Sequence, residues 1–221
     1  MYFNMFYCGG RLWDARPWFE MTKSDQGGIV IMEKKANILP VYVEKVYCGA
    51  ANILKQELLS LGGELSIHKY AVNCKEEFSD VLILGTYKHY RFLYKKLALQ
   101  HWKLKELGQE LKITINNIMM SQRLTPERVS ESNYQEIKSL ALDFKPSGDI
   151  LKDMAGLSLI ERGHSKDKII VLASGQFTDI IFMQEYILAL QSKGYEVLLI
   201  GEQAEEKWIV TIFRPDYIYI V

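Results

Sequence analysis

The stretch of residues 46–73, "VYCGAANILKQELLSLGGELSIHKYAVN", carries the clearest pattern of secondary structure in the first half of the chain. Within it, apolar residues recur at helical spacing between Ala50 and Leu61, which predicts an amphipathic helix. Gly62 and Gly63 end that helix, because the residue just past a helix commonly adopts a left-handed conformation. Residues 64–70 then alternate between apolar and polar, as a half-buried strand does. The stretch is therefore a helix-to-strand unit.

Small residues mark both ends of this unit, and we expect them to serve packing and turn geometry. Ala51 should lie against a neighbouring strand without room for a larger side chain, and one glycine of the pair should have a positive φ. The residues of this structural signature are Ala50, Ala51, Asn52, Gly62, Gly63 and Gly85.

Flanking segments extend the unit into an α/β domain over residues 28–112. The segment 1–27 is aromatic without a clear period, so we expect an irregular arm. The other predicted elements of this half are strands over 28–32, 38–46 and 80–85 and a long helix over about 87–111.

The middle of the chain, residues 113–165, is polar and predicts a helical connector. Thr125 is the candidate N-cap of one helix there, with Pro126 at its first position.

Residues 166–221 alternate strand and helix with short connections. Such a βαβαβ order is typical of half of a doubly wound, Rossmann-like parallel sheet. The overall prediction is thus an α/β protein with two small lobes. The chain ends at the third strand, so we expect the first lobe, a partner chain or a longer polypeptide to complete the sheet. The predicted elements are strands over 168–174, 195–201 and 214–221 and helices over 178–194 and 204–213.

Composition indicates an ordinary globular protein. Hydrophobic residues make up 48% and charged residues 24%, and the formal net charge is +0 with a pI near 6.9. A bulk electrostatic attraction to nucleic acid or to an anionic membrane is therefore not favoured. The apolar runs are too short for a membrane span, and the N-terminus lacks the pattern of a signal peptide.

The three cysteines, Cys8, Cys48 and Cys74, form no CxxC pair. We interpret them as reduced thiols in a cytoplasmic protein, with Cys48 and Cys74 acting as small buried apolar residues.

The signature also carries a family resemblance. The runs 50–57 and 59–63, followed by "DVLILGT" at 80–86, resemble the N-terminal accessory domain of long-form dihydropteroate synthases over about residues 28–112. The second block of the resemblance continues through Tyr90, Leu93, Lys96, Leu97 and Gln100.

In that family a TIM barrel following the accessory domain performs catalysis in the folate pathway. Its strand-end motif, approximately N-x-T-P-D-S-F-S-D-G-G, is absent here. Residues 113–221 are also too few for an eight-stranded barrel. The resemblance therefore implies a link to pterin, folate or one-carbon metabolism, with no catalytic residue to transfer.

A second resemblance is to the cobalamin-binding modules of corrinoid methyltransferases, over about 166–221. The shared features are the strand, the loop, the "GYEV" at 194–197 and the later "PD". The loop at 175–181 lacks the D-x-H-x-x-G motif that supplies the cobalt-ligating histidine. A corrinoid is therefore an alternative cofactor without a histidine ligand from this loop.

Two loops at the carboxyl ends of parallel strands form the candidate ligand site, since ligands bind at that edge of an open sheet. A helix beginning at Thr178 would favour an anion such as phosphate, and the alternative is an ordinary turn with Thr178 as N-cap. Gly85 and Thr86 form a third such turn. The candidate residues are Ser174, Gly175, Gln176 and Thr178 on one side and Gly201, Glu202 and Gln203 on the other.

The helix after Gly85 is basic and aromatic. Such a face can stack on single-stranded nucleic acid, but its leucine spacing favours a core helix. The four histidines show no metal-ligand spacing, and we identify no nucleophile–base pair, so we predict no metal site and no catalytic residue.

These observations favour a non-catalytic binding or partner domain. Alternatives are a fragment of a dihydropteroate synthase or corrinoid-dependent methyltransferase component, and a sensor of a corrinoid or nucleotide. We also expect self-association, or docking to a larger partner, through an uncovered edge strand over Tyr217–Val221.

Overall fold

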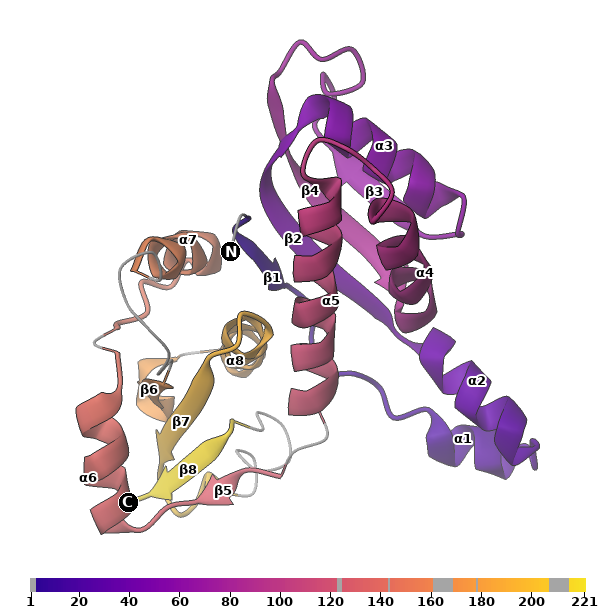
Figure 1. The fold of residues 1–221 in the computed structure, drawn as a ribbon. Coiled ribbons are helices and arrows are strands. Elements are labelled where there is room, and N and C mark those ends of the chain that lie inside the picture. The colour runs from indigo at the N-terminus through magenta and orange to yellow at the C-terminus, as the bar shows by residue number, and fades with distance from the viewer. Residues whose placement is uncertain (1–2, 123–124, 143, 161–168, 178, 207–214) are drawn as a thin grey trace. The chain divides into compact units, whose positions relative to one another are not determined.

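The computed structural model describes residues 1–221 apart from 1–2, 123–124, 143, 161–168, 178 and 207–214 (Figure 1). The chain divides into two units, Met1–Ile115 and Asn116–Val221. Each unit has its own four-stranded sheet with helices against it, which confirms the α/β class.

The sheet of the first unit is antiparallel. Its order is β1-β2-β4-β3, with β2 (Ile38–Tyr47) and β4 (Phe78–Thr86) in the centre and β1 (Met5–Tyr7) and β3 (Glu64–Ile67) at the edges. The strand order and directions are those of a βαββαβ sandwich whose last strand is replaced by the N-terminal β1. The strands expected over 38–46, 64–70 and 80–85 are present.

Helices of the first unit bury apolar stripes against this sheet. Helix α3 (Cys48–Leu59) begins two residues before the predicted start and buries Ala51, Leu54 and Leu58. Helix α4 (Tyr87–Leu97) packs beside α3 and buries Tyr90, Leu93 and Leu97, as expected for a core helix.

The strand predicted over 28–32 is wrong, because this segment lies inside helix α2 (Gln26–Ala36). The side chain of Asp25 caps the helix by accepting a hydrogen bond from the Gly28 amide at 3.1 Å. A short run of β-branched residues fits a strand or a helix equally well, and the cap decides between them.

The irregular arm predicted over 1–27 is also partly wrong. Residues Met5–Tyr7 form β1 and are fully buried, and Arg16–Met21 form helix α1. The β1 strand pairs with β2 through Phe6 opposite Tyr42.

The single helix predicted over 87–111 is two helices, α4 and α5 (Leu104–Ser121). The chain turns between them, where Trp102 and Lys103 have φ values of 53° and 62°. No glycine or proline marks this break, so the sequence pattern does not reveal it.

The sheet of the second unit is parallel, in the order β5-β8-β7-β6. Strands β6 (Ile169–Ala173) and β7 (Glu196–Gly201) and helix α8 (Ile180–Ser192) between them lie where the sequence predicts them. Strand β8 (Tyr217–Ile220) pairs with β7. The helix expected over 204–213 falls mostly outside the described residues.

The fourth strand of this sheet is β5 (Glu127–Arg128), from the segment predicted to be a connector. The N-cap predicted at Thr125 is wrong: the chain is extended at β5, and Ser130 caps helix α6 (Glu131–Leu140) instead. Helix α7 (Ile150–Ile160) follows and packs against α8.

This arrangement corrects the expectation of an uncovered C-terminal edge. Strand β8 lies between β5 and β7, with Val129 donating its amide hydrogen to the carbonyl of Ile218. The parallel sheet gains its fourth strand from within its own unit.

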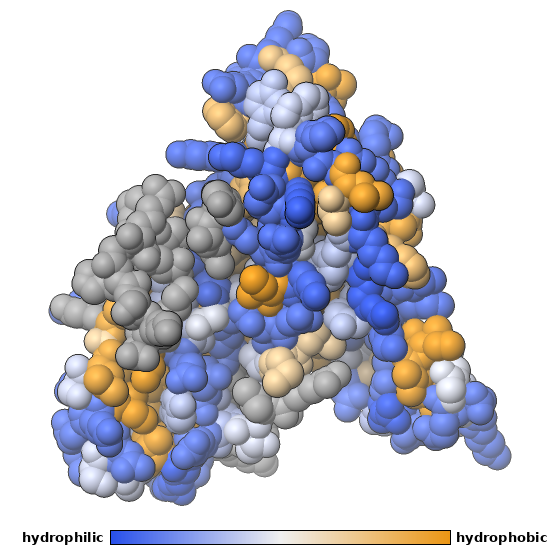
Figure 2. Space-filling view, in the orientation of Figure 1, coloured by the Kyte–Doolittle hydropathy of each residue, from blue (hydrophilic) through white to orange (hydrophobic). Residues whose placement is uncertain are grey.

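The visible surface is mostly polar, with an apolar patch over α1 and α2 in the first unit (Figure 2). The exposed apolar side chains of these two helices are Trp18, Met21, Val30 and Ile31. None of the helices in the described part of the chain is both long and apolar enough to span a bilayer.

Candidate functional site

The carboxyl edge of the parallel sheet gathers the two predicted ligand loops. Strand β6 continues into a short 3-10 turn, η1 (Ser174–Gln176), and β7 continues into the turn at 202–205. Because β6 and β7 are parallel neighbours, with Ala173 opposite Ile200, both loops leave the same edge of the sheet.

Glu205 joins the two loops. Its Oε2 accepts a hydrogen bond from the Ser174 hydroxyl at 2.6 Å and another from the Glu202 amide at 2.9 Å. Glu205 is not among the residues that the sequence predicted for this edge. The only signal was its position three residues after Glu202, within a turn that brings a carboxylate back onto a backbone amide.

The amide side chains of the two loops bond locally. Gln176 accepts a hydrogen bond from the Ala173 amide at 3.0 Å, and Gln203 donates one to Glu206 at 2.8 Å. Glu206 also pairs with Arg128 of β5 at 3.0 Å. These contacts hold the loops in shape.

Asp179 occupies the start of α8, where an anion was expected. Its Oδ1 accepts hydrogen bonds from the amides of Ile181 at 2.7 Å and Phe182 at 3.2 Å, so it is the N-cap of this helix. The predicted cap and ligand residue Thr178 lies outside the described residues. The first-turn donors of α8 are thus bonded to a carboxylate of the chain, which favours the capped-turn interpretation of this loop.

The two loops are also acidic: one carries Asp179 and the other Glu202, Glu205 and Glu206, and Glu206 pairs with Arg128. Among the described residues there is open space around Gly175, because a Cβ built on it would meet none of their atoms within 4 Å. This geometry suits a neutral or cationic hydrogen-bonding group better than a phosphate.

The third predicted turn belongs to the other sheet, so Gly85 and Thr86 do not join this edge. Thr86 caps α4 and forms a reciprocal pair with His89. The pKa of His89 is lowered by burial and, to a lesser degree, by the charge of Lys88. The ring of Tyr90 packs close to Gly85, where there is no side chain. The Tyr90 hydroxyl donates a hydrogen bond to the carbonyl of Leu39 at 2.7 Å.

The signature residues of α3 have structural surroundings. Ala50 and Ala51 are 1% and 0% exposed, and Gly62 has the expected positive φ, at 88°. A Cβ on Gly63 would lie 2.6 Å from Leu58 and 3.1 Å from the Leu84 carbonyl oxygen. The paired glycine therefore provides a left-handed turn first and a close backbone approach second.

Other residues of the dihydropteroate synthase resemblance also bond to one another. The carboxylate of Glu57 in α3 accepts hydrogen bonds from Lys96 at 2.6 Å and from Gln100 at 2.9 Å. They tie α3 to the end of α4, so this part of the resemblance is explained by the fold.

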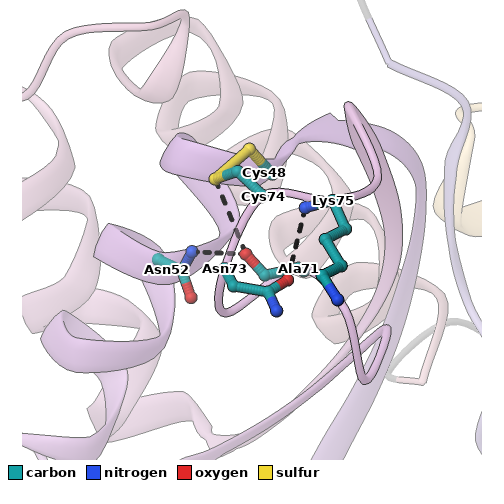
Figure 3. Close-up of a disulfide and its surroundings, with 6 residues drawn as sticks. All are labelled: Cys48, Asn52, Ala71, Asn73, Cys74 and Lys75. Atoms are coloured by element: carbon teal, nitrogen blue, oxygen red, sulfur yellow. Dashed lines mark hydrogen bonds between the residues drawn. A yellow bond between two sulfur atoms is a disulfide. The ribbon is translucent and has the colours of Figure 1, made fainter.

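Asn52 and a disulfide secure the loop that follows β3 (Figure 3). The side chain of Asn52 donates a hydrogen bond to the carbonyl of Ala71 at 2.8 Å. Cys48 and Cys74 are joined through their sulfurs, with Cα atoms 5.5 Å apart. The expectation of three reduced thiols is therefore wrong for this pair, and Cys8 is the cysteine outside the disulfide. Spacing of 26 residues gave no sign of the pairing.

Among the described residues, no group of three His, Cys, Asp or Glu side chains is placed to hold a metal ion.

Together the fold and this edge define a two-unit α/β protein with an antiparallel and a parallel sheet. It is similar to the bifunctional dihydropteroate synthase/dihydropteroate reductase of Helicobacter pylori (strain ATCC 700392 / 26695), with 30% identity over 117 residues. The match covers 49% of this chain and 31% of that protein, so the chain spans about a third of its relative's length. No family model and no solved structure matches the chain.

Proposed function

We propose that the chain is a non-catalytic partner domain of a dihydropteroate synthase-type enzyme in folate metabolism. The observation that carries this proposal is the 30% identity to a dihydropteroate synthase/reductase over about half of the chain. The strand-end motif of that family's barrel is absent from the sequence. The described strands form two four-stranded sheets, and neither is a closed barrel.

The apolar patch on α1 and α2 supports a docking role. Exposed apolar side chains gathered in one place mark interaction surfaces more often than scattered ones do. The two helices are tied to each other: Arg16 of α1 pairs with Glu33 of α2 at 2.7 Å, and the backbone of Trp13, before α1, exchanges two hydrogen bonds with the side chain of Asn37, after α2. Because the relative carries synthase activity on a longer polypeptide, the catalytic synthase chain is the partner that we propose for this surface.

Two measurements test the proposal. The purified chain alone should form no dihydropteroate from a pterin pyrophosphate and p-aminobenzoate, and it should reduce no dihydropteroate. It should co-sediment with the dihydropteroate synthase encoded in the same genome. Product formed above a no-enzyme control would show that the chain is itself catalytic.

Variants locate the docking surface. Ile31→Glu places a charge in the patch, at a side chain 57% exposed, and should abolish co-sedimentation without unfolding the protein. Leu99→Glu is the matched control, since Leu99 is 83% exposed and lies outside α1 and α2. Equal binding by both variants would remove the patch from the proposal, and absence of binding by the unmodified chain would overturn it.

A further inference from the structure

The disulfide joins two cysteines in very different surroundings. Cys48 is 1% exposed and is the first residue of α3. Cys74 is exposed, in a loop where every residue from Val72 to Phe78 is exposed. We propose that this disulfide is a site of reversible thiol exchange, in which a low-molecular-weight thiolate attacks the sulfur of Cys74 and Cys48 is the leaving group.

Access decides which sulfur is attacked. Thiol–disulfide exchange requires a thiolate to reach one sulfur of the bond, and the exposed partner is the one it reaches. Because Cys48 is buried, an incoming thiolate does not reach its sulfur. The nucleophile must therefore come through the 72–78 loop.

Helix α3 stabilises the departing sulfur. A thiolate at the first residue of a helix lies close to the amides of the first turn and to the positive end of the helix dipole. Tyr47, the N-cap residue, supplies no side-chain acceptor to these amides. A negative charge on Cys48 is thus favoured by the local backbone, and a better leaving group departs faster.

Contacts outside the disulfide keep the two cysteines close once the bond is open. The Asn52 side chain holds the carbonyl of Ala71, and the amide of Cys48 donates a hydrogen bond to the carbonyl of Glu77 at 2.9 Å. The sulfur of Cys74 lies 3.7 Å from the Ala71 carbonyl oxygen, which can accept a hydrogen bond from this group in its thiol form. The loop is therefore anchored on both sides of Cys74 in either state.

The exchange balances in atoms and electrons. The incoming thiolate forms a new S–S bond to Cys74, the Cys48–Cys74 bond breaks, and its electron pair leaves with Cys48 as a thiolate. One disulfide is consumed and one is formed, so no oxidant is needed. In the reverse step the Cys48 thiolate attacks the sulfur of Cys74, the Cys48–Cys74 bond forms again, and the small molecule leaves as a thiolate.

Glutathione serves as the probe. Cys48→Ser and Cys74→Ser variants are each incubated with oxidised glutathione, and the modified cysteine is followed by peptide mass spectrometry. Cys74 in the first variant should be modified at least about tenfold faster than Cys48 in the second, because the exposed cysteine can reach glutathione and the buried one cannot. Cys8 is present in both and is the internal reference. Equal or reversed rates would overturn the proposal, after circular dichroism has shown that both variants are folded.

The unmodified protein provides a test that does not depend on the variants. It is treated with reduced glutathione, quenched with acid and alkylated, and the mixed disulfide is mapped. Glutathione on Cys74 with an alkyl group on Cys48 is the expected pattern. Glutathione on Cys48, or a protein isolated in air with both thiols free, would contradict the assignment.

Discussion

Single residues in α3 set the closest packing of the first unit. Ala51 is 0% exposed, and a Cβ on Gly63 would meet both a side chain and a backbone carbonyl, so the chain has small residues where larger ones have no space. This part of the signature could be predicted from the sequence, because a helix followed by paired glycines needs a turn at that point.

Replacing Ala51 should test the packing interpretation. Ala51→Leu inserts three carbon atoms into a filled position and should lower the free energy of unfolding by about 1–3 kcal/mol. Chemical denaturation with a far-ultraviolet signal measures it. Gln56→Leu is the control on the exposed side of α3, with an expected change within about 0.5 kcal/mol. An unchanged midpoint for Ala51→Leu would mean that the site has room.

The disulfide and the Glu205 contacts could not be predicted at this scale. Three scattered cysteines allow three pairings as well as none, and only the folded loop brings Cys74 to Cys48. Glu205 bonds to Ser174, 31 positions away, after two strands have aligned. Side-chain contacts across such distances are set by the fold and leave no local pattern.

At the scale of elements, buried strands and capped helices were the predictable part. Strands β6 and β7 are continuous apolar runs, and glycine ends α8 at Gly194, where φ is 85°. Two-residue β5 is too short for any periodicity. Helix α2 buries only Ile29, so its apolar residues do not show a helical stripe.

Asp216 links three elements of the second unit and makes their stability depend on pH. Its Oδ2 accepts hydrogen bonds from the Val197 amide of β7 at 2.8 Å and from Gln191 of α8 at 3.2 Å. Burial is the main cause that raises the pKa of Asp216 above 3.8, and these hydrogen bonds only partly oppose it. The folded protein therefore holds this proton at pH values where the unfolded chain has lost it.

The sign of the pH effect follows from this difference. Since the folded state binds more protons, the stability contributed by Asp216 is complete below about pH 4 and is lost as pH rises through its raised pKa. Asp216→Asn keeps an oxygen acceptor and cannot ionise, so its free energy of unfolding should fall less than that of the unmodified protein from pH 4 upward. Urea titrations across this range measure both profiles. The exposed Glu136→Gln is the control, and parallel profiles for Asp216→Asn would contradict the argument.

At the scale of the whole molecule, the chain forms two units with separate sheets. The sequence predicted two lobes, but it put residues 113–165 between them as a connector. Those residues supply β5, α6 and α7 to the second unit, because a parallel strand pairs with neighbours far along the chain. The sheet expected to need a partner thus has four strands from this chain.

Reduction of the disulfide should lower the stability of the first unit and leave that of the second unit unchanged. The Cys48–Cys74 bond closes a loop of 26 residues within the first unit, and its loss should lower that unit's unfolding free energy by about 3–4 kcal/mol through the entropy of the unfolded chain. Hydrogen exchange with a dithiol reductant should therefore accelerate at β2 and β4 and stay constant at β6 and β7. Leu199→Ala is the reciprocal control: this 0% exposed residue of β7 should cost about 2–5 kcal/mol in the second unit alone. Acceleration in all four strands under reductant would show instead that the units unfold together.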